Sequence, residues 1–271
     1  MKKTIYILTL LCAATSTQAQ VGIGTTSPAT SSVLDVSSTT KGLLAPRMTT
    51  AQRDAITSPA TGLQIYNTDN AALETFTGTT GEWFTLGRGN GAVASNTAVG
   101  VDALKYNTTG YGNAANGYQA LLSNTTGNWN TANGYQALYT NTTGNYNVAN
   151  GYNSLYSNTT GTYNVANGSH TLRFNTTGNY NVANGFNSLR FNTTGSYNTA
   201  NGYQVLYANT TGSSNVANGW NSLGANTTGN SNVANGFNSL RSNTTGANNT
   251  ANGNWALFSN PTWYGNTTNG Y

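Results

Sequence analysis

The residues that could do acid–base or metal chemistry are few in this chain. Its 271 residues include six Asp and Glu, one His and one Cys, and no acidic residue follows Asp102. His170 stands where equivalent positions of other repeats carry Gln, Asn or Asp. Acid–base catalysis needs placed carboxylates or imidazoles, and hard cations need carboxylate clusters. The sequence therefore predicts no catalytic residue, no metal site and no cofactor, and the chain is not expected to be an enzyme.

Amide, hydroxyl and aromatic side chains are instead repeated at a fixed spacing. From Asn107 to Ser259 a 17-residue unit, NTTGxxNxANGxxxLxx, occurs nine times without insertion or deletion. Because a fixed period over many copies is typical of stacked layers, each copy is expected to be one coil of a rod. Any function should then belong to a repeated surface, where identical weak sites give avidity.

The Asn-Thr-Thr tripeptide at the start of each copy allows three interpretations. It makes a good turn with the Gly that follows, it is formally an N-glycosylation acceptor, and a flat row of Thr could order water and bind ice. The turn interpretation is favoured. The candidate glycosylation or surface-contact residues are Asn107, Asn124, Asn141, Asn158, Asn175, Asn192, Asn209, Asn226 and Asn243.

Aromatic residues recur at two further positions of the repeat. The candidate contact stripe is formed by Tyr118, Tyr135, Tyr152, Phe186, Tyr203, Trp220 and Phe237, and a second series by Trp129, Tyr146, Tyr163, Tyr180 and Tyr197. Aromatic ladders more often pack between coils or chains than bind a ligand. If exposed, they would form a stripe for sugar stacking or self-association.

The repeat also indicates which elements hold these side chains. Gly at two fixed places, such as Gly127 and Gly134, marks two corners per coil. Two short extended segments are expected between them, for example residues 129–132 and 135–138, since Gly and Asn disfavour a helix. The predicted fold class is all-β: a parallel β-solenoid or β-roll with 17-residue coils, plus a small N-terminal β-rich module.

One Leu and one Ala recur in every copy. The Leu is expected to face inward, and the Ala to mark a close approach between sheets or between chains. The predicted core ladder is Leu121, Leu138, Leu155, Leu172, Leu189, Leu206, Leu223, Leu240 and Leu257. One large aliphatic side chain per coil is a thin core against the entropy of ordering 17 residues. Burial between chains is the simplest remedy, so a homo-oligomer is expected, either a trimer or a filament.

The chain divides into five segments. Residues 1–20 are typical of a signal peptide, with Lys2 and Lys3 before an apolar stretch and a small-residue cleavage site. Residues 21–89 form the N-terminal module, 90–106 a degenerate first repeat, 107–259 the nine full repeats and 260–271 a partial, capping repeat. In the module, strands are expected at 33–36 and 63–66, a Thr-capped helix near 50–56, and a hairpin pairing 74–76 with 83–85.

The charge of the chain excludes one class of partner. Charged residues make up 6% of the sequence, and the formal net charge is +4. From Asn107 onward the charged side chains are Arg173, Arg190 and Arg241. Since no basic stripe is present for phosphates to follow, nucleic-acid binding is not expected.

Two stretches resemble known families. Asn96-Thr97-Ala98-Val99-Gly100 with Ala103-Leu104, and later copies such as NTANGYQAL, resemble the YadA-like head repeats of trimeric autotransporter adhesins. That resemblance implies a left-handed parallel β-roll in which three chains pack side by side. The stretch VGIGTTSPATSSVLDVSSTTKGLLAPRMTTAQRDAI resembles the opening module of secreted Bacteroidetes proteins.

The sequence thus favours a secreted, non-enzymatic, adhesin-like surface fibre that contacts a carbohydrate or a host or neighbouring cell surface. It would be extracellular and could be associated with the cell surface. One alternative is a subunit of a self-assembling extracellular filament, in which exposed strand edges join end to end. A second alternative is an ice-binding β-solenoid.

Overall fold

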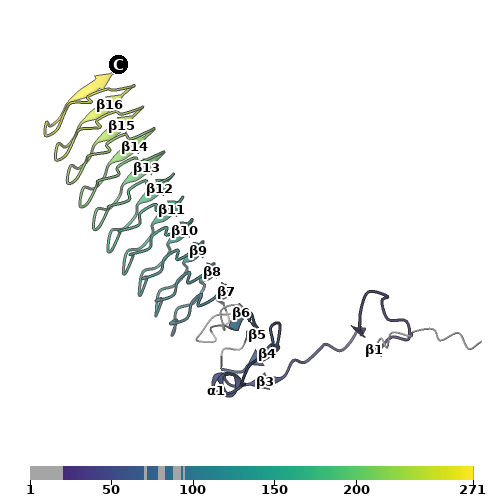
Figure 1. Ribbon diagram of the computed structural model, residues 1–271. Coiled ribbons are helices and arrows are strands. Elements are labelled where there is room, and N and C mark those ends of the chain that lie inside the picture. Colours follow the sequence, from purple (N-terminus) through teal and green to yellow (C-terminus); the bar gives the residue numbers. More distant parts are fainter. Residues whose placement is uncertain (1–20, 70–71, 79–82, 88–92, 94, 271) are drawn as a thin grey trace, which may run out of the picture. The chain divides into compact units, whose positions relative to one another are not determined.

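A computed structural model describes residues 21–69, 72–78, 83–87, 93 and 95–270 (Figure 1). The predicted signal peptide, residues 1–20, lies outside the described residues. The chain divides into two compact units, Met1–Ala45 and Pro46–Tyr271, so the segment 21–89 is shared between them.

The first unit contains two short parallel strands, β1 (Val21–Ile23) and β2 (Leu34–Val36). No side chain between residues 21 and 45 is buried. Its apolar side chains are exposed instead: Val21, Ile23, Val33, Leu34, Val36, Leu43 and Leu44. This unit therefore has strand pairing but no core of its own.

The second unit opens with a small mixed structure. Its elements are β3 (Arg47–Met48), α1 (Thr50–Asp54), β4 (Gln64–Asn67), β5 (Ala72–Phe76) and β6 (Trp83–Gly87). Strand β3 pairs with β4 in parallel, and β4, β5 and β6 form an antiparallel meander. The predicted strands, helix and hairpin are confirmed, although the hairpin residues 79–82 lie outside the described part of the chain.

Local hydrogen bonds explain why this opening structure forms. Thr49 caps the helix in a reciprocal box with Gln52. Glu74 on β5 is fully buried and accepts from Arg53 Nη1 at 2.8 Å. A buried carboxylate needs such a charged partner. The helix is thereby tied to the sheet.

The sheet continues into the repeats without a break. Strand β6 pairs antiparallel with β7 (Thr97–Val99), and from β7 onward all pairs are parallel. The following strands are β8 (Ala114–Asn116), β9 (Thr131–Asn133), β10 (Val148–Asn150), β11 (Val165–Asn167), β12 (Val182–Asn184), β13 (Thr199–Asn201), β14 (Val216–Asn218), β15 (Val233–Asn235), β16 (Thr250–Asn252) and β17 (Thr267–Asn269). Figure 1 shows them stacked along one side of the coils. The predicted all-β parallel solenoid is confirmed.

Each coil contains one strand, not the two extended segments that we predicted. Thr131–Asn133 is a strand, but residues 135–140 form turns. The reason is that the second segment holds Gln136 and Leu138 at φ 52°, in the left-handed region. The backbone there still bonds to adjacent coils, since Leu138 N donates to Ser154 O at 3.0 Å.

The core ladder positions lie inside the coils. The leucines from Leu121 to Leu240 are 0% exposed, and Leu257 in the last full copy is partly buried. The Ala at the middle of each strand, such as Ala149, is also 0% exposed. The interior is completed by two Asn per coil, such as Asn141 and Asn147, which are fully buried as well.

Candidate functional site

The asparagines of the Asn-Thr-Thr tripeptides are not at the surface. Asn107 is 4% exposed, and the other eight candidates, Asn124 to Asn243, are 0% exposed. Asn141 Nδ2 donates to Asn124 Oδ1 at 2.8 Å and to Gly144 O at 3.1 Å. This ladder runs coil by coil from Asn107 to Asn243. The expectation that these residues form a glycosylation or surface-contact row is wrong for the folded chain, because their side-chain amides are buried and hydrogen-bonded inside the solenoid.

The recurrence of Asn at three places per copy predicts stacked Asn side chains along the rod, and a second buried ladder confirms it. In each coil the Asn before the strand, such as Asn181, binds the previous coil through its side chain and its backbone. Asn181 N and Nδ2 both donate to Asn164 Oδ1, at 3.0 and 3.1 Å, and Nδ2 also donates to Gly195 O at 2.9 Å. Its occurrence in every copy, while neighbouring positions vary, was the available signal. Both Asn ladders therefore stabilise the rod and are unavailable to a ligand.

The two Thr of each tripeptide lie in different environments. The first is half-buried in most copies, and its hydroxyl donates to the next coil, as Thr176 Oγ1 does to Thr193 O at 3.0 Å. The second, such as Thr177, is exposed. The hydroxyls of the first Thr row thus donate to backbone carbonyls of the next coil, and only the second Thr of each tripeptide forms an exposed row.

The candidate aromatic stripe lies on the surface. Its members are exposed by between 36% (Tyr203) and 52% (Trp220). Tyr118, Tyr135 and Tyr152 are stacked with centroids 5.1 and 5.2 Å apart, which is close to the spacing of adjacent β-strands. The stripe therefore packs against itself along the rod and presents its ring edges and faces outward.

His170 belongs to this stripe. In its coil Ser169 replaces the aromatic residue, and the His170 ring contacts Tyr152 and Phe186, at centroid distances of 5.2 and 6.2 Å. Burial lowers the pKa of His170, and the charges of Arg173 and Arg190 lower it further. His170 thus bridges a gap in the row, and its surroundings disfavour the charged form of the ring.

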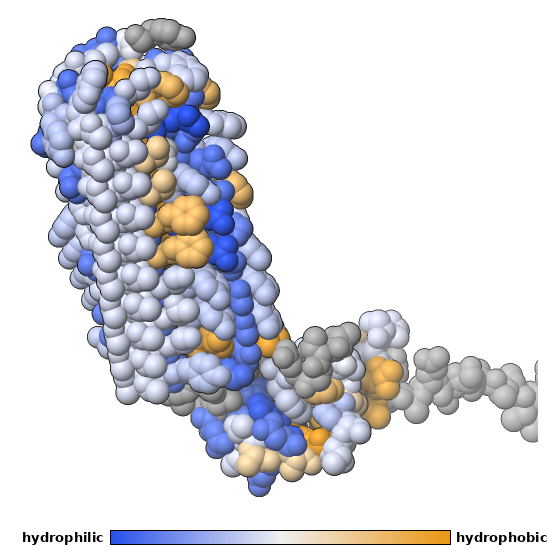
Figure 2. All heavy atoms as spheres, turned by 60° about the vertical axis from the view of Figure 1, so that its left-hand side comes forward, coloured by the Kyte–Doolittle hydropathy of each residue, from blue (hydrophilic) through white to orange (hydrophobic). Residues whose placement is uncertain are grey.

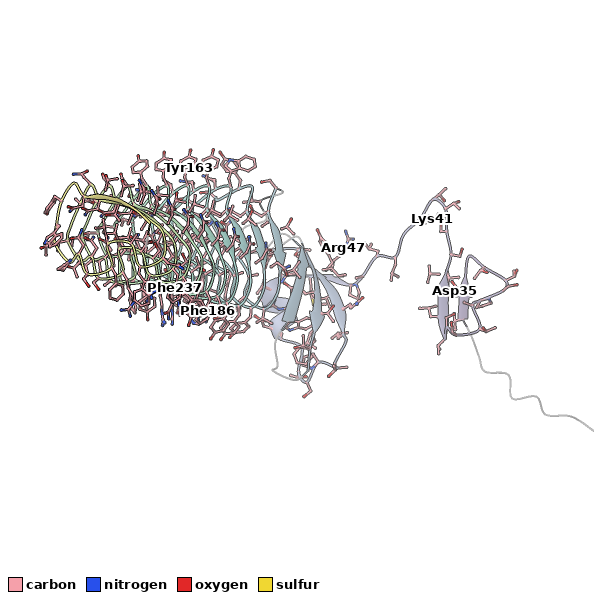
Figure 3. All side chains as sticks on the ribbon, turned by 90° about the horizontal axis from the view of Figure 1, so that it is seen from above. Asp35, Lys41, Arg47, Tyr163, Phe186 and Phe237 are labelled. Carbon is pink, nitrogen blue, oxygen red and sulfur yellow. The ribbon has the colours of Figure 1, made fainter. Side chains whose placement is uncertain are left out.

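The second aromatic series forms another exposed row. Tyr146, Tyr163 and Tyr180 are stacked at 4.8 and 4.9 Å and are nearly parallel, and each is more than 44% exposed. Figure 3 shows the row at Tyr163 on the opposite side of the solenoid from Phe186 and Phe237. Two sides of the rod therefore present aromatic rings.

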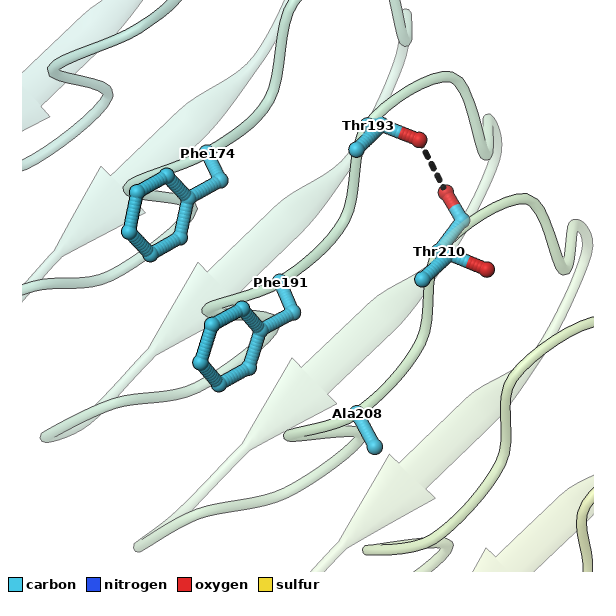
Figure 4. Close-up of a pocket in the computed structure, with 5 residues that line it drawn as sticks. All are labelled: Phe174, Phe191, Thr193, Ala208 and Thr210. Atoms are coloured by element: carbon cyan, nitrogen blue, oxygen red, sulfur yellow. Dashed lines mark hydrogen bonds between the residues drawn. The ribbon is translucent and has the colours of Figure 1, made fainter.

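A third cluster departs from the repeat in two successive coils. Phe174 and Phe191 are stacked at 5.2 Å with an interplanar angle of 8°. With Thr193, Ala208 and Thr210 they line a shallow groove of about 410 Å³ (Figure 4). Figure 2 shows apolar side chains gathered part-way along one face of the solenoid. The signal in the sequence was the Arg-Phe pair, which occurs at the same place in two consecutive copies.

The described residues offer no other chemistry. Among them no group of three or more His, Cys, Asp and Glu could hold a metal ion. In the same part of the chain, no helix has the length and hydropathy of a membrane span. The features that the geometry does show are repeated contact surfaces.

One comparison with known proteins gives a match. Residues 22–100 match the family model described as a phage tail like trimerisation region, which covers less than a third of the chain. Neither the curated proteins nor the solved structures include a significant match to the chain. The matched segment begins in the strand pair of the first unit and ends just after β7, where the solenoid begins.

Proposed function

We propose that this protein is a non-enzymatic, trimeric fibre protein, in which residues 22–100 join three chains and the solenoid forms the shaft or head. The observation that carries the proposal is the match of this segment to a phage tail like trimerisation region. The segment leads directly into the repeats through the β6–β7 pairing. Trimerisation would therefore place three solenoids at the same end of one assembly.

The first unit supplies a physical reason for association. Leu43 is 79% exposed, Leu44 70% and Val33 78%, and no side chain of residues 21–45 is buried. Burying a Leu or Val side chain contributes about 1.5–3 kcal/mol. Three copies of this segment could bury these side chains against one another, which a single copy cannot do.

The solenoid suits the role of a fibre. It buries Leu, Ala and Asn in every coil and leaves aromatic rings and polar side chains outside. The resemblance of its repeats to adhesin heads and the signal-like residues 1–20 support a secreted, adhesin-like protein at the cell surface. Its repeated exposed rows would bind a carbohydrate or a neighbouring surface by avidity.

The solution mass of the full chain tests the trimer. Light scattering coupled to size exclusion should give three times the mass of the chain, which is 28.3 kDa before any processing. A mass of one chain at micromolar concentration would contradict the proposal. Electron microscopy of the same sample separates discrete trimers, which we expect, from end-to-end filaments. Fractionation of the producing cells and culture medium tests secretion.

A further inference from the structure

Two unpaired arginines lie side by side on the solenoid. Arg173 and Arg190 occupy the same position in consecutive coils, and each guanidinium lies against the ring that follows it, 5.2 Å from Phe174 and 5.3 Å from Phe191. Within the described residues neither side chain makes a salt bridge, and their buried Nε atoms have no hydrogen-bond partner. No Asp or Glu occurs in the repeats to pair with them.

This arrangement is not needed to build the coil. At the arginine position other copies carry Leu122, Tyr139 or Tyr207, and at the phenylalanine position they carry small residues such as Ser157 and Ala225. The coils keep the same strand and the same turns with these residues. Two like charges in adjacent coils repel each other. Aromatic rings on both sides of each guanidinium offset part of this cost, but among the described residues no carboxylate does. The cluster is therefore better explained by a ligand than by folding.

The groove along the two Phe rings suggests the form of that ligand. It is lined by the two Phe rings, the Thr193 and Thr210 side chains and Ala208, and it crosses successive coils (Figure 4). The rings repeat every 5.2 Å, a length similar to one pyranose unit along an extended glycan. Apolar faces of sugar rings stack on aromatic side chains, while a planar guanidinium binds carboxylates through two parallel hydrogen bonds.

We propose that Arg173, Arg190, Phe174 and Phe191 form a binding site for an acidic polysaccharide, such as a chain of uronic acids. The apolar faces of the sugar rings would lie in the groove against the open edges of the two Phe rings, and their carboxylates would pair with the two guanidinium groups. A second copy of this chain is a poorer occupant, because its repeats carry no carboxylate to offer. The site does not require the trimer, so binding and assembly can fail independently.

Binding of hexagalacturonate to the full-length protein, measured by calorimetry, tests the proposal. The double variant Arg173→Gln with Arg190→Gln should weaken binding at least about tenfold, the effect of losing one charged hydrogen bond or more. The fully methyl-esterified hexamer, which has the same rings but no charge, should bind the unaltered protein at least about tenfold less tightly for the same reason. Added salt should weaken binding of the acid but not of the ester.

The chain provides a matched control for charge. Arg241 occupies the equivalent position in a later coil and lies over Phe258, but Ser242 follows it in place of Phe. Arg241→Gln should leave the affinity for hexagalacturonate unchanged, and Phe174→Ser with Phe191→Ser should weaken it while keeping its salt dependence. Circular dichroism and the melting temperature verify that each variant folds.

Three results would overturn the proposal. The first is equal affinity of the double Arg variant and the unaltered protein for hexagalacturonate, which includes absence of binding to both. The second is equal affinity of the acid and its ester. The third is a change in solution mass on replacing the two arginines, which would make this face a contact between copies of the chain.

Discussion

The first unit and the repeats differ in which side chains they bury: the first unit exposes apolar side chains, and the repeats bury polar ones. Residues 21–45 leave Leu43 and Leu44 exposed and bury no side chain, although two strands pair there. The repeats bury polar amides at 0% exposure and satisfy them through ladders such as Asn124 to Asn141. The solenoid forms the hydrogen bonds of its two buried Asn ladders within one chain, whereas the described part of the first unit leaves its apolar side chains exposed.

This difference indicates which interactions stabilise each region. A buried polar group is costly only when unpaired, and stacking identical coils pairs the Asn of each of the two buried ladders with its copies in adjacent coils. A two-stranded pairing without a core is marginal at best, so under the proposed function the first unit gains its stability from association. Changes in the first unit should therefore act on assembly, and changes in the repeats should act on unfolding.

The largest expected effect is on assembly. Replacing Leu43 and Leu44 by Asp should convert the trimer to single chains while leaving the circular dichroism of the solenoid unchanged. At the burial energy of Leu, six such side chains per trimer contribute roughly 10 kcal/mol. Light scattering measures the mass. Tyr197→Asp, which puts the same charge on a 60% exposed residue of the solenoid, is the control and should remain trimeric.

The next effect is on the core of the rod. Leu172→Ala should lower the free energy of unfolding by about 2–5 kcal/mol, because it leaves a cavity between stacked coils. Leu172 is 0% exposed and lies in the middle of the stack. Denaturation by guanidinium, followed by circular dichroism, gives this value. Leu257→Ala, in the last full copy and only partly buried, should cost clearly less; an equal loss would show that the ladder is not what stabilises the coils.

Much of this fold could be predicted because the repeat encodes it directly. The fixed 17-residue period implies stacked coils, and the recurring Leu faces inward. What failed was the assignment of Asn141 and its equivalents to a surface row, since Asn-Thr-Thr-Gly looks like an ordinary turn in one copy. Variation between copies was the better guide to which positions are exposed. Tyr146 is replaced by Ser214 in a later coil, and this position is exposed, whereas the Asn next to it never changes.

The turn geometry and the groove could not be predicted for physical reasons. Leu ordinarily avoids positive φ, so nothing local in the sequence indicated that Leu172 has a φ of 50° and lies in a turn. Tertiary stacking imposes that conformation. The two Arg-Phe pairs are visible in the sequence, but the groove depends on how the Phe174 and Phe191 rings are oriented once the coils are stacked.

The buried Asn ladder that contains Asn181 can be compared with a partly buried row of Asn at the strand ends, which contains Asn184. Asn181→Ala should lower the free energy of unfolding by about 1–3 kcal/mol, because the buried Asn198 N–H loses its acceptor, Asn181 Oδ1. Asn164 Oδ1 and Gly195 O each lose one of two donors as well. Asn184, at the end of the strand in the same coil, donates to Asn201 Oδ1 at 2.7 Å but is only partly buried. Asn184→Ala should cost clearly less, because water can satisfy its partner. Equal costs, measured by guanidinium denaturation, would mean that burial does not distinguish the ladders.

The smallest effect expected is a pH dependence that arises at one position of the rod. The pKa of His170 is lowered by burial and by the charges of Arg173 and Arg190, so folding favours the neutral ring. Above the ordinary pKa of about 6.5 this has no cost; as the pH falls through that value, the unfolded chain takes up the proton more readily and the folded state loses stability. The melting temperature should therefore drop between about pH 7.5 and pH 5 more in the unaltered protein than in His170→Gln. Identical drops in the two proteins would show that the His170 ring is not held neutral within the row, and that the solenoid's pH response arises elsewhere.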